Sequence, residues 1–144
     1  MCQRLYIATR TELPSVRKRK GATELALCPA GPDLVTMRRH FNASEFPYLY
    51  VAEGHAPCGC GFPEESPGKR KPKRQAEDLG TMKRLQEAIR PAVRGRPRVQ
   101  MVLCVVGEEN EEIVPGPTIA IEELGSPGFQ FRSLERLTVV KSAP

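Results

Sequence analysis

Residues 99–106, with the sequence VQMVLCVV, carry apolar side chains on both faces of an extended chain. A strand of this kind is typical of the middle of a sheet, where both of its faces are covered. The run therefore predicts a central strand, which needs further strands beside it and helices over it.

Those further elements are predicted from periodicity and turn residues. Apolar runs between turns indicate strands at 5–8, 24–28, 48–52, 118–122 and 137–140. Asp33 suits a helix N-cap, and the short helix after it would bury the stripe Leu34, Met37 and Phe41. The clearest helical stripe covers residues 76–90.

The order of these elements predicts an α+β fold. We expect a single domain over residues 1–144, with a mixed β-sheet and about two helices covering one of its faces. Residues 63–75 are rich in proline, glycine and positive charge, and are expected to form a flexible basic loop.

Composition narrows the class of protein. No run in the 144 residues approaches the roughly 18 apolar residues that a membrane span needs, and the N-terminus lacks the apolar core of a signal peptide. The five cysteines are odd in number and scattered, unlike those of a secreted disulfide scaffold. A cytoplasmic protein with reduced thiols and no membrane contact is expected.

Residues 54–62, GHAPCGCGF, concentrate the reactive chemistry of the chain. Thiolate sulfur and neutral imidazole nitrogen are good ligands for Zn²⁺, and the spacing lets His55, Cys58 and Cys60 converge from one loop. A structural zinc site needs a fourth protein ligand. We expect Cys2 in that role, because its strand could pair beside the 48–52 strand.

Three other residues are weaker candidates for the fourth ligand. Cys28 and Cys104 lie in apolar strand patterns, where a small buried hydrophobe is the commoner role. His40 lies near the predicted end of a helix and is expected to be a surface or capping residue.

The same segment also permits thiol chemistry. Cα atoms two residues apart in an extended chain are separated by about 6.5–7 Å, so Cys58 and Cys60 need only a bend at Gly59 to form a disulfide. A protonated His55 would favour the Cys58 thiolate, or His55 could serve as a base for a nucleophilic cysteine. Alternatively, the segment is a tight glycine-rich turn that only packs, or one whose amides face an anion.

The formal net charge is +5, and two clusters carry much of it. One is Arg17–Lys20, and the other comprises Lys69, Arg70, Lys71, Lys73 and Arg74. Clusters of this kind steer proteins toward nucleic acid, although they are also common in solvated loops. A nucleic-acid-binding module is therefore the alternative to a metal or thiol site.

Three segments carry a resemblance to a known group of proteins. The pattern CxxLYIA from Cys2, residues 41–50 and the GHxxCGCGF motif at 54–62 are similar to a family of small bacterial proteins of unassigned function. The resemblance covers about the first 60 residues. It implies a bacterial cytoplasmic protein and supplies no reaction, substrate or cofactor.

Overall fold

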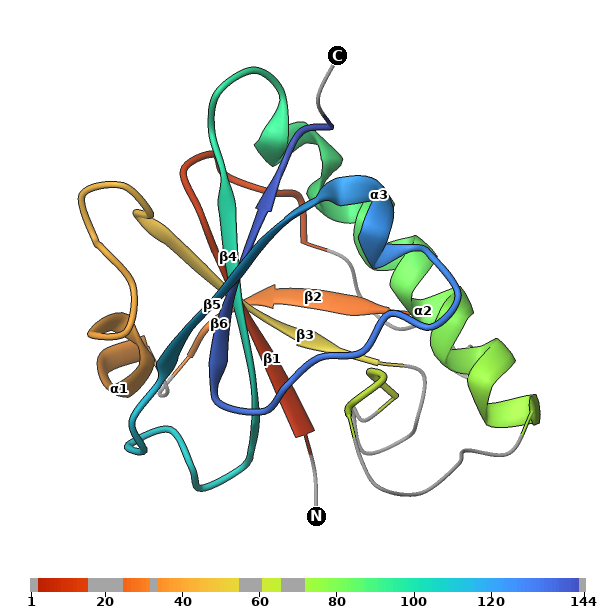
Figure 1. Cartoon of the computed structure of the whole chain (residues 1–144). Coiled ribbons are helices and arrows are strands. Elements are labelled where there is room, and N and C mark those ends of the chain that lie inside the picture. Colours follow the sequence, from red (N-terminus) through yellow and green to blue (C-terminus); the bar gives the residue numbers. More distant parts are fainter. Residues whose placement is uncertain (1–2, 16–24, 32–33, 55–60, 66–71, 143–144) are drawn as a thin grey trace.

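In the part of the chain that the structure describes, six strands form one mixed sheet in the order β2-β3-β1-β4-β6-β5 (Figure 1). The computed structural model describes residues 3–15, 25–31, 34–54, 61–65 and 72–142. The strands are β1 (Gln3–Thr9), β2 (Ala26–Pro29), β3 (Tyr48–Glu53), β4 (Val99–Val105), β5 (Val114–Ala120) and β6 (Glu135–Val140). The helices are α1 (Leu34–Arg38), α2 (Pro72–Ile89), the 3-10 turn η1 (Arg90–Val93) and α3 (Ile121–Leu124).

The central position predicted for residues 99–106 is confirmed. Strand β4 lies between β1 and β6, antiparallel to both, and its residues Val99–Cys104 are buried. Strand β1 also pairs with β3 on its other side, with Leu5 opposite Ala52. The α+β class and the mixed sheet follow the sequence prediction.

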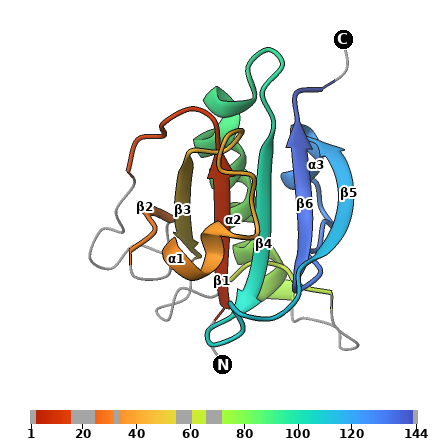
Figure 2. The same cartoon turned by 90° about the vertical axis from the view of Figure 1, so that its left-hand side faces the viewer.

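The helices cover both faces of the sheet, whereas one covered face was expected (Figure 2). The long α2 and the short α3 pack on the face that contains Leu5 and Ile7. On the opposite face, Tyr6 and Ala8 pack with α1 and the segment after it. Because β1 is apolar at consecutive positions, both of its faces need cover.

Helix α2 begins four residues earlier than the predicted residue 76, at Pro72. Proline is favoured in the first turn of a helix, because its missing N–H would have no partner there and its φ suits the helix. Residues 72–75 of the predicted loop are therefore helical. The predicted stripe is confirmed where Met82, Leu85 and Ile89 are buried.

The strand predicted at 118–122 is shifted and is followed by a helix. Strand β5 starts at Val114 and ends at Ala120, and Ile121 opens α3. Strand β5 contains Pro115 and Pro117, and as an edge strand it tolerates their missing N–H donors. Strand β5 is parallel to β6, and α3 lies on the connection between them. No helix in the described ranges is long and apolar enough to cross a membrane.

Candidate functional site

The four predicted metal ligands, His55, Cys58, Cys60 and Cys2, lie outside the described residues. The chain on both sides of them is described. Gly54 follows β3 and is buried, and Gly61 resumes the chain after the segment 55–60. The structural information on this predicted site therefore comes from the residues that flank it.

The downstream flank is anchored in the larger core. Phe62 is completely buried and packs edge to face against Phe131, with 6.3 Å between ring centroids and 86° between ring planes. Gly61 has a φ of 120°, a conformation that glycine adopts without a steric penalty. The glycine and the aromatic residue together lead residues 61–62 into the core.

Residues 63–65 continue along the connection that leads into β6. The Phe131 amide donates to the Pro63 carbonyl at 2.7 Å, and the Glu65 amide donates to the Phe131 carbonyl at 2.8 Å. The guanidinium of Arg132 lies 2.7 Å from the Glu65 carboxylate. This hydrogen bond raises the pKa of Arg132, with further help from the charges of Glu65 and Glu135.

The start of β1 lies against both flanks. The Gln3 side-chain amide donates to the Glu64 carboxylate at 2.7 Å, and Figure 1 shows residues 61–65 beside the beginning of β1. The antiparallel register sets Leu5 opposite Ala52, so counting two further residues along each strand sets Gln3 level with Gly54. The predicted pairing of the N-terminal strand with the 48–52 strand is confirmed.

The three alternative ligands all lie within the described residues. Cys104 is 1% exposed, as expected for a small buried hydrophobe. Cys28 is exposed, which is contrary to expectation, because β2 is an edge strand and Leu27 supplies its buried side chain. His40 is half-buried, and its Nε2 lies 2.9 Å from the Glu109 backbone oxygen.

Glu109 was not singled out in the sequence, where it belongs to an acidic run. It is 8% exposed, and its carboxylate accepts hydrogen bonds from the Tyr6 hydroxyl at 3.2 Å and the Gly107 amide at 2.9 Å. These contacts fix the loop after β4. Among the residues that the structure describes, no group of three or more His, Cys, Asp or Glu could hold a metal ion.

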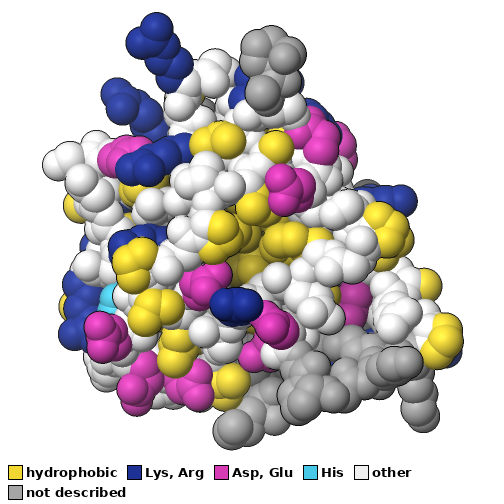
Figure 3. All heavy atoms as spheres, viewed as in Figure 1, with side chains coloured by type: hydrophobic (Ala, Val, Ile, Leu, Met, Phe, Trp, Pro, Cys, Tyr) yellow, Lys and Arg dark blue, Asp and Glu magenta, His cyan; other side chains and the backbone are white. Residues whose placement is uncertain are grey.

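A cavity of about 430 Å³ adjoins the downstream flank. Its lining includes Ile119 of β5, Leu137 of β6 and the ring of Phe129, with Arg132 and Glu135 also present. Apolar side chains gather in a hollow near the middle of the face in Figure 3. The Phe129 ring packs edge to face on Phe131 at 4.9 Å. The alternating Phe129 and Phe131 were visible in the sequence, but the cavity also depends on β5.

The likeness of residues 2–8, 41–50 and 54–62 to small bacterial proteins stays a prediction. No protein-family model, curated protein or solved structure matches this chain.

Proposed function

We propose that this chain is a metal-binding protein of the bacterial cytoplasm that holds Zn²⁺, or a similar borderline or soft ion, through Cys2, His55, Cys58 and Cys60. The observation that carries the proposal is the hydrogen bond between Gln3 and Glu64. Gln3 follows Cys2 directly, and Glu64 lies four residues after Cys60. Two cysteine-bearing segments distant in sequence thus have flanks in direct contact.

The upstream flank supports the same grouping. The β1–β3 register, extended by count, sets Gln3 level with Gly54, the residue before His55. Anchored flanks restrict where the six residues 55–60 can reach. Restricting them lowers the entropy that is lost when the ligands close around an ion.

Cysteine side chains must stay reduced to bind a metal, so the proposed site needs a reducing compartment. Cys28 is an exposed free thiol, which fits a cytoplasmic protein. A reducing compartment keeps Cys58 and Cys60 available as thiolates for a metal. A redox role, in which the same two thiols form a reversible disulfide, remains the alternative for this segment.

Metal analysis tests the proposal. Protein purified without a tag is expected to carry about one equivalent of zinc per chain, because four ligands complete one tetrahedral site. Cys58→Ser and Cys60→Ser should each lose most of it. A chelator should lower the Tm of the wild-type protein, since a metal that binds the folded state stabilises it.

Cys28→Ser is the matched control, because Cys28 is an exposed, unpaired thiol on the edge strand. It should retain the metal. A metal-free protein whose Cys58 and Cys60 form a disulfide that reductant removes reversibly would favour the redox role. A metal-free protein without that disulfide would rule out both, leaving a glycine-rich turn that only packs.

One observation favours nucleic-acid binding as a second candidate function. Lys73 and Arg74 are exposed at the start of α2, so they project from a helix and not from the loop that was expected. If the basic clusters bind nucleic acid, the affinity should fall steeply with salt, because phosphate contacts release counterions.

An anisotropy titration with an oligonucleotide at about 50 mM salt tests this second candidate. Binding should weaken when five side chains are neutralised: Lys69, Arg70, Lys71, Lys73 and Arg74. Cys58→Ser should leave it unchanged. An absence of binding at this salt concentration would remove the candidate.

A further inference from the structure

Three arginines share one pocket at the end of the sheet where β1 stops and β4 starts. The pocket has a volume of about 200 Å³ and is lined by Arg10, Glu45, Arg96, Pro97 and Arg98. Arg10 comes one residue after β1, and Arg98 comes one residue before β4. None of these residues belongs to the proposed metal site.

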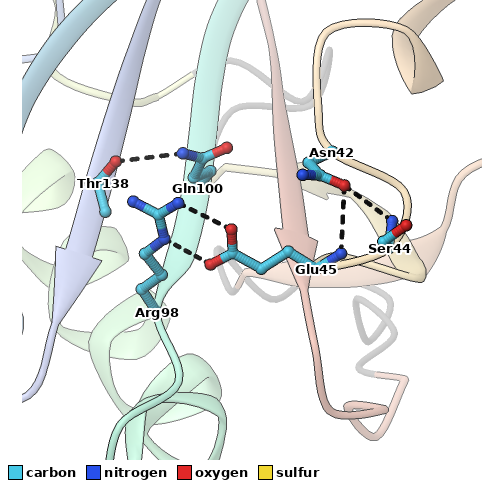
Figure 4. Close-up of polar contacts among 6 residues, drawn as sticks. All are labelled: Asn42, Ser44, Glu45, Arg98, Gln100 and Thr138. Carbon is cyan, nitrogen blue, oxygen red and sulfur yellow. Dashed lines mark hydrogen bonds and ion pairs between the residues drawn. The ribbon is translucent and has the colours of Figure 1, made fainter.

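Arg98 is held in place from two sides, and Figure 4 shows its contact with Glu45. Its Nε and NH2 donate to the two carboxylate oxygens of Glu45 at 2.5 and 2.7 Å. Its guanidinium carbon lies 5.8 Å from the centre of the Phe46 ring, within range of a cation–π contact. These contacts fix the guanidinium and leave NH1 without a hydrogen bond among the described residues.

Glu45 is itself positioned by a turn. The side-chain oxygen of Asn42 accepts from the Ser44 amide at 2.9 Å and from the Glu45 amide at 3.4 Å (Figure 4). The hydrogen bond from Arg98 lowers the pKa of Glu45, and the charge of Arg10 adds to that effect. Glu45 is therefore ionised at neutral pH and contributes one negative charge to the pocket.

The charges in this pocket do not balance. Arg10 and Arg96 form no hydrogen bond or ion pair with any residue that the structure describes, and Glu45 is the one described carboxylate in the lining beside three guanidinium groups. The β1–β4 register pairs Ala8 with Gln100, and by count it sets Arg10 level with Arg98. Like charges that face each other across neighbouring strands are destabilising, and a bound anion would relieve this repulsion.

We propose that Arg10, Arg96 and the free NH1 of Arg98 bind a phosphate group. Guanidinium groups donate in a planar fork that matches phosphate oxygens, and hydrogen bonds between ionised partners are stronger than neutral ones. The pocket is smaller than the roughly 300–1,000 Å³ of sites that enclose a whole small ligand. It therefore holds the phosphate itself, and the rest of a larger ligand remains in solvent.

The phosphate could belong to a small phosphorylated molecule or to a nucleic-acid backbone. Inorganic phosphate, pyrophosphate and a single-stranded oligonucleotide are the probes, titrated by calorimetry at about 20 mM salt, where charge contacts are weakly screened. Binding of pyrophosphate without the oligonucleotide indicates the first source. Oligonucleotide binding that depends on the same arginines indicates the second. Either result supports the phosphate site.

The test variant is Arg10→Gln with Arg96→Gln, which removes two charges and leaves the Arg98–Glu45 pair in place. Its affinity for the bound probe should fall by about tenfold or more, the effect expected on losing charge-assisted hydrogen bonds. The matched control is Lys83→Gln with Arg84→Gln, which removes two exposed charges from α2 outside the basic cluster. Pyrophosphate affinity should change little in that control.

Three outcomes would overturn the proposal. One is that no probe binds at low salt. Another is that the double arginine variant binds as tightly as the wild type. The third is that the two double variants lose pyrophosphate affinity equally, because binding would then follow net charge and not this pocket. A matching circular dichroism spectrum and Tm would establish that the arginine variant is folded.

Discussion

Phe62→Ala should lower the free energy of unfolding by about 3–5 kcal/mol, the usual cost of removing a buried aromatic ring. Phe62 is fully buried, its ring meets Phe131, and it belongs to the core between the sheet and α2. Its loss leaves a cavity in that core and removes the edge-to-face contact. Urea denaturation followed by circular dichroism measures the change.

Phe129→Ala is the matched comparison. Phe129 also packs edge to face on Phe131 but is only partly buried, so its truncation should cost less. Phe62→Leu keeps most of the buried volume and serves as a second variant if Phe62→Ala does not fold. A cost below about 1 kcal/mol for Phe62→Ala would be out of line with a fully buried ring.

The same variants connect the core to the proposed metal site. Phe62 lies two residues after Cys60, so it is the first described core side chain after the proposed ligands. Phe62→Leu is therefore expected to bind zinc more weakly than Phe129→Ala does. Equal metal content and equal chelator sensitivity in the two variants would show that the packing of Phe62 does not influence metal binding.

Periodicity predicted most of the individual elements, because each depends on neighbours in sequence. The apolar run at 99–106 predicted the central strand, and the apolar run at 5–8 predicted β1. The pairing of β1 with β3 could also be anticipated, and it is the prediction that gives Cys2 its place in the proposed site.

Features that depend on tertiary context could not be predicted in this way. A run containing Pro115 and Pro117 is not a recognisable strand until its position at the sheet edge is known. Ile121 reads as the continuation of a strand, yet Ile121 and Leu124 turn into the core as one helical turn. Helices cover both faces of the sheet because β1 pairs with the apolar strands β3 and β4. That pairing cannot be read from any single segment of the sequence.

The cysteine motif and the arginine pocket differ in the same way, one depending on local sequence and the other on tertiary context. The cysteine motif is visible because its ligands are close in sequence. The arginine pocket is not, because Arg10, Glu45 and Arg98 come from three separate segments that only strand pairing brings together. None of the three pocket arginines, Arg10, Arg96 and Arg98, belongs to the two basic clusters that drew attention in the sequence. Charge density along the chain therefore points to the two basic clusters and gives no sign of this pocket.

Gly116→Ala should be destabilising by about 1–3 kcal/mol, the usual cost of adding volume where there is no room. A methyl group on Gly116 would lie 2.5 Å from Cγ of Glu135 and 2.7 Å from the backbone oxygen of Arg136. The Glu135 side chain can turn away, but the Arg136 oxygen belongs to β6 and cannot. Strands β5 and β6 would have to separate at the register shift between Pro115 and Thr118.

Gly80→Ala is the matched control, because a methyl group there meets nothing within 4 Å. Gly80 lies inside α2, where alanine favours the helix, so this variant should be more stable by about 0.4–1 kcal/mol. Thermal denaturation of the two variants should therefore shift the Tm in opposite directions. Adding Glu135→Ala to Gly116→Ala should recover only part of the loss, because the clash with the Arg136 oxygen remains. Full recovery would mean that the side chain, and not the backbone of β6, limits the space at Gly116.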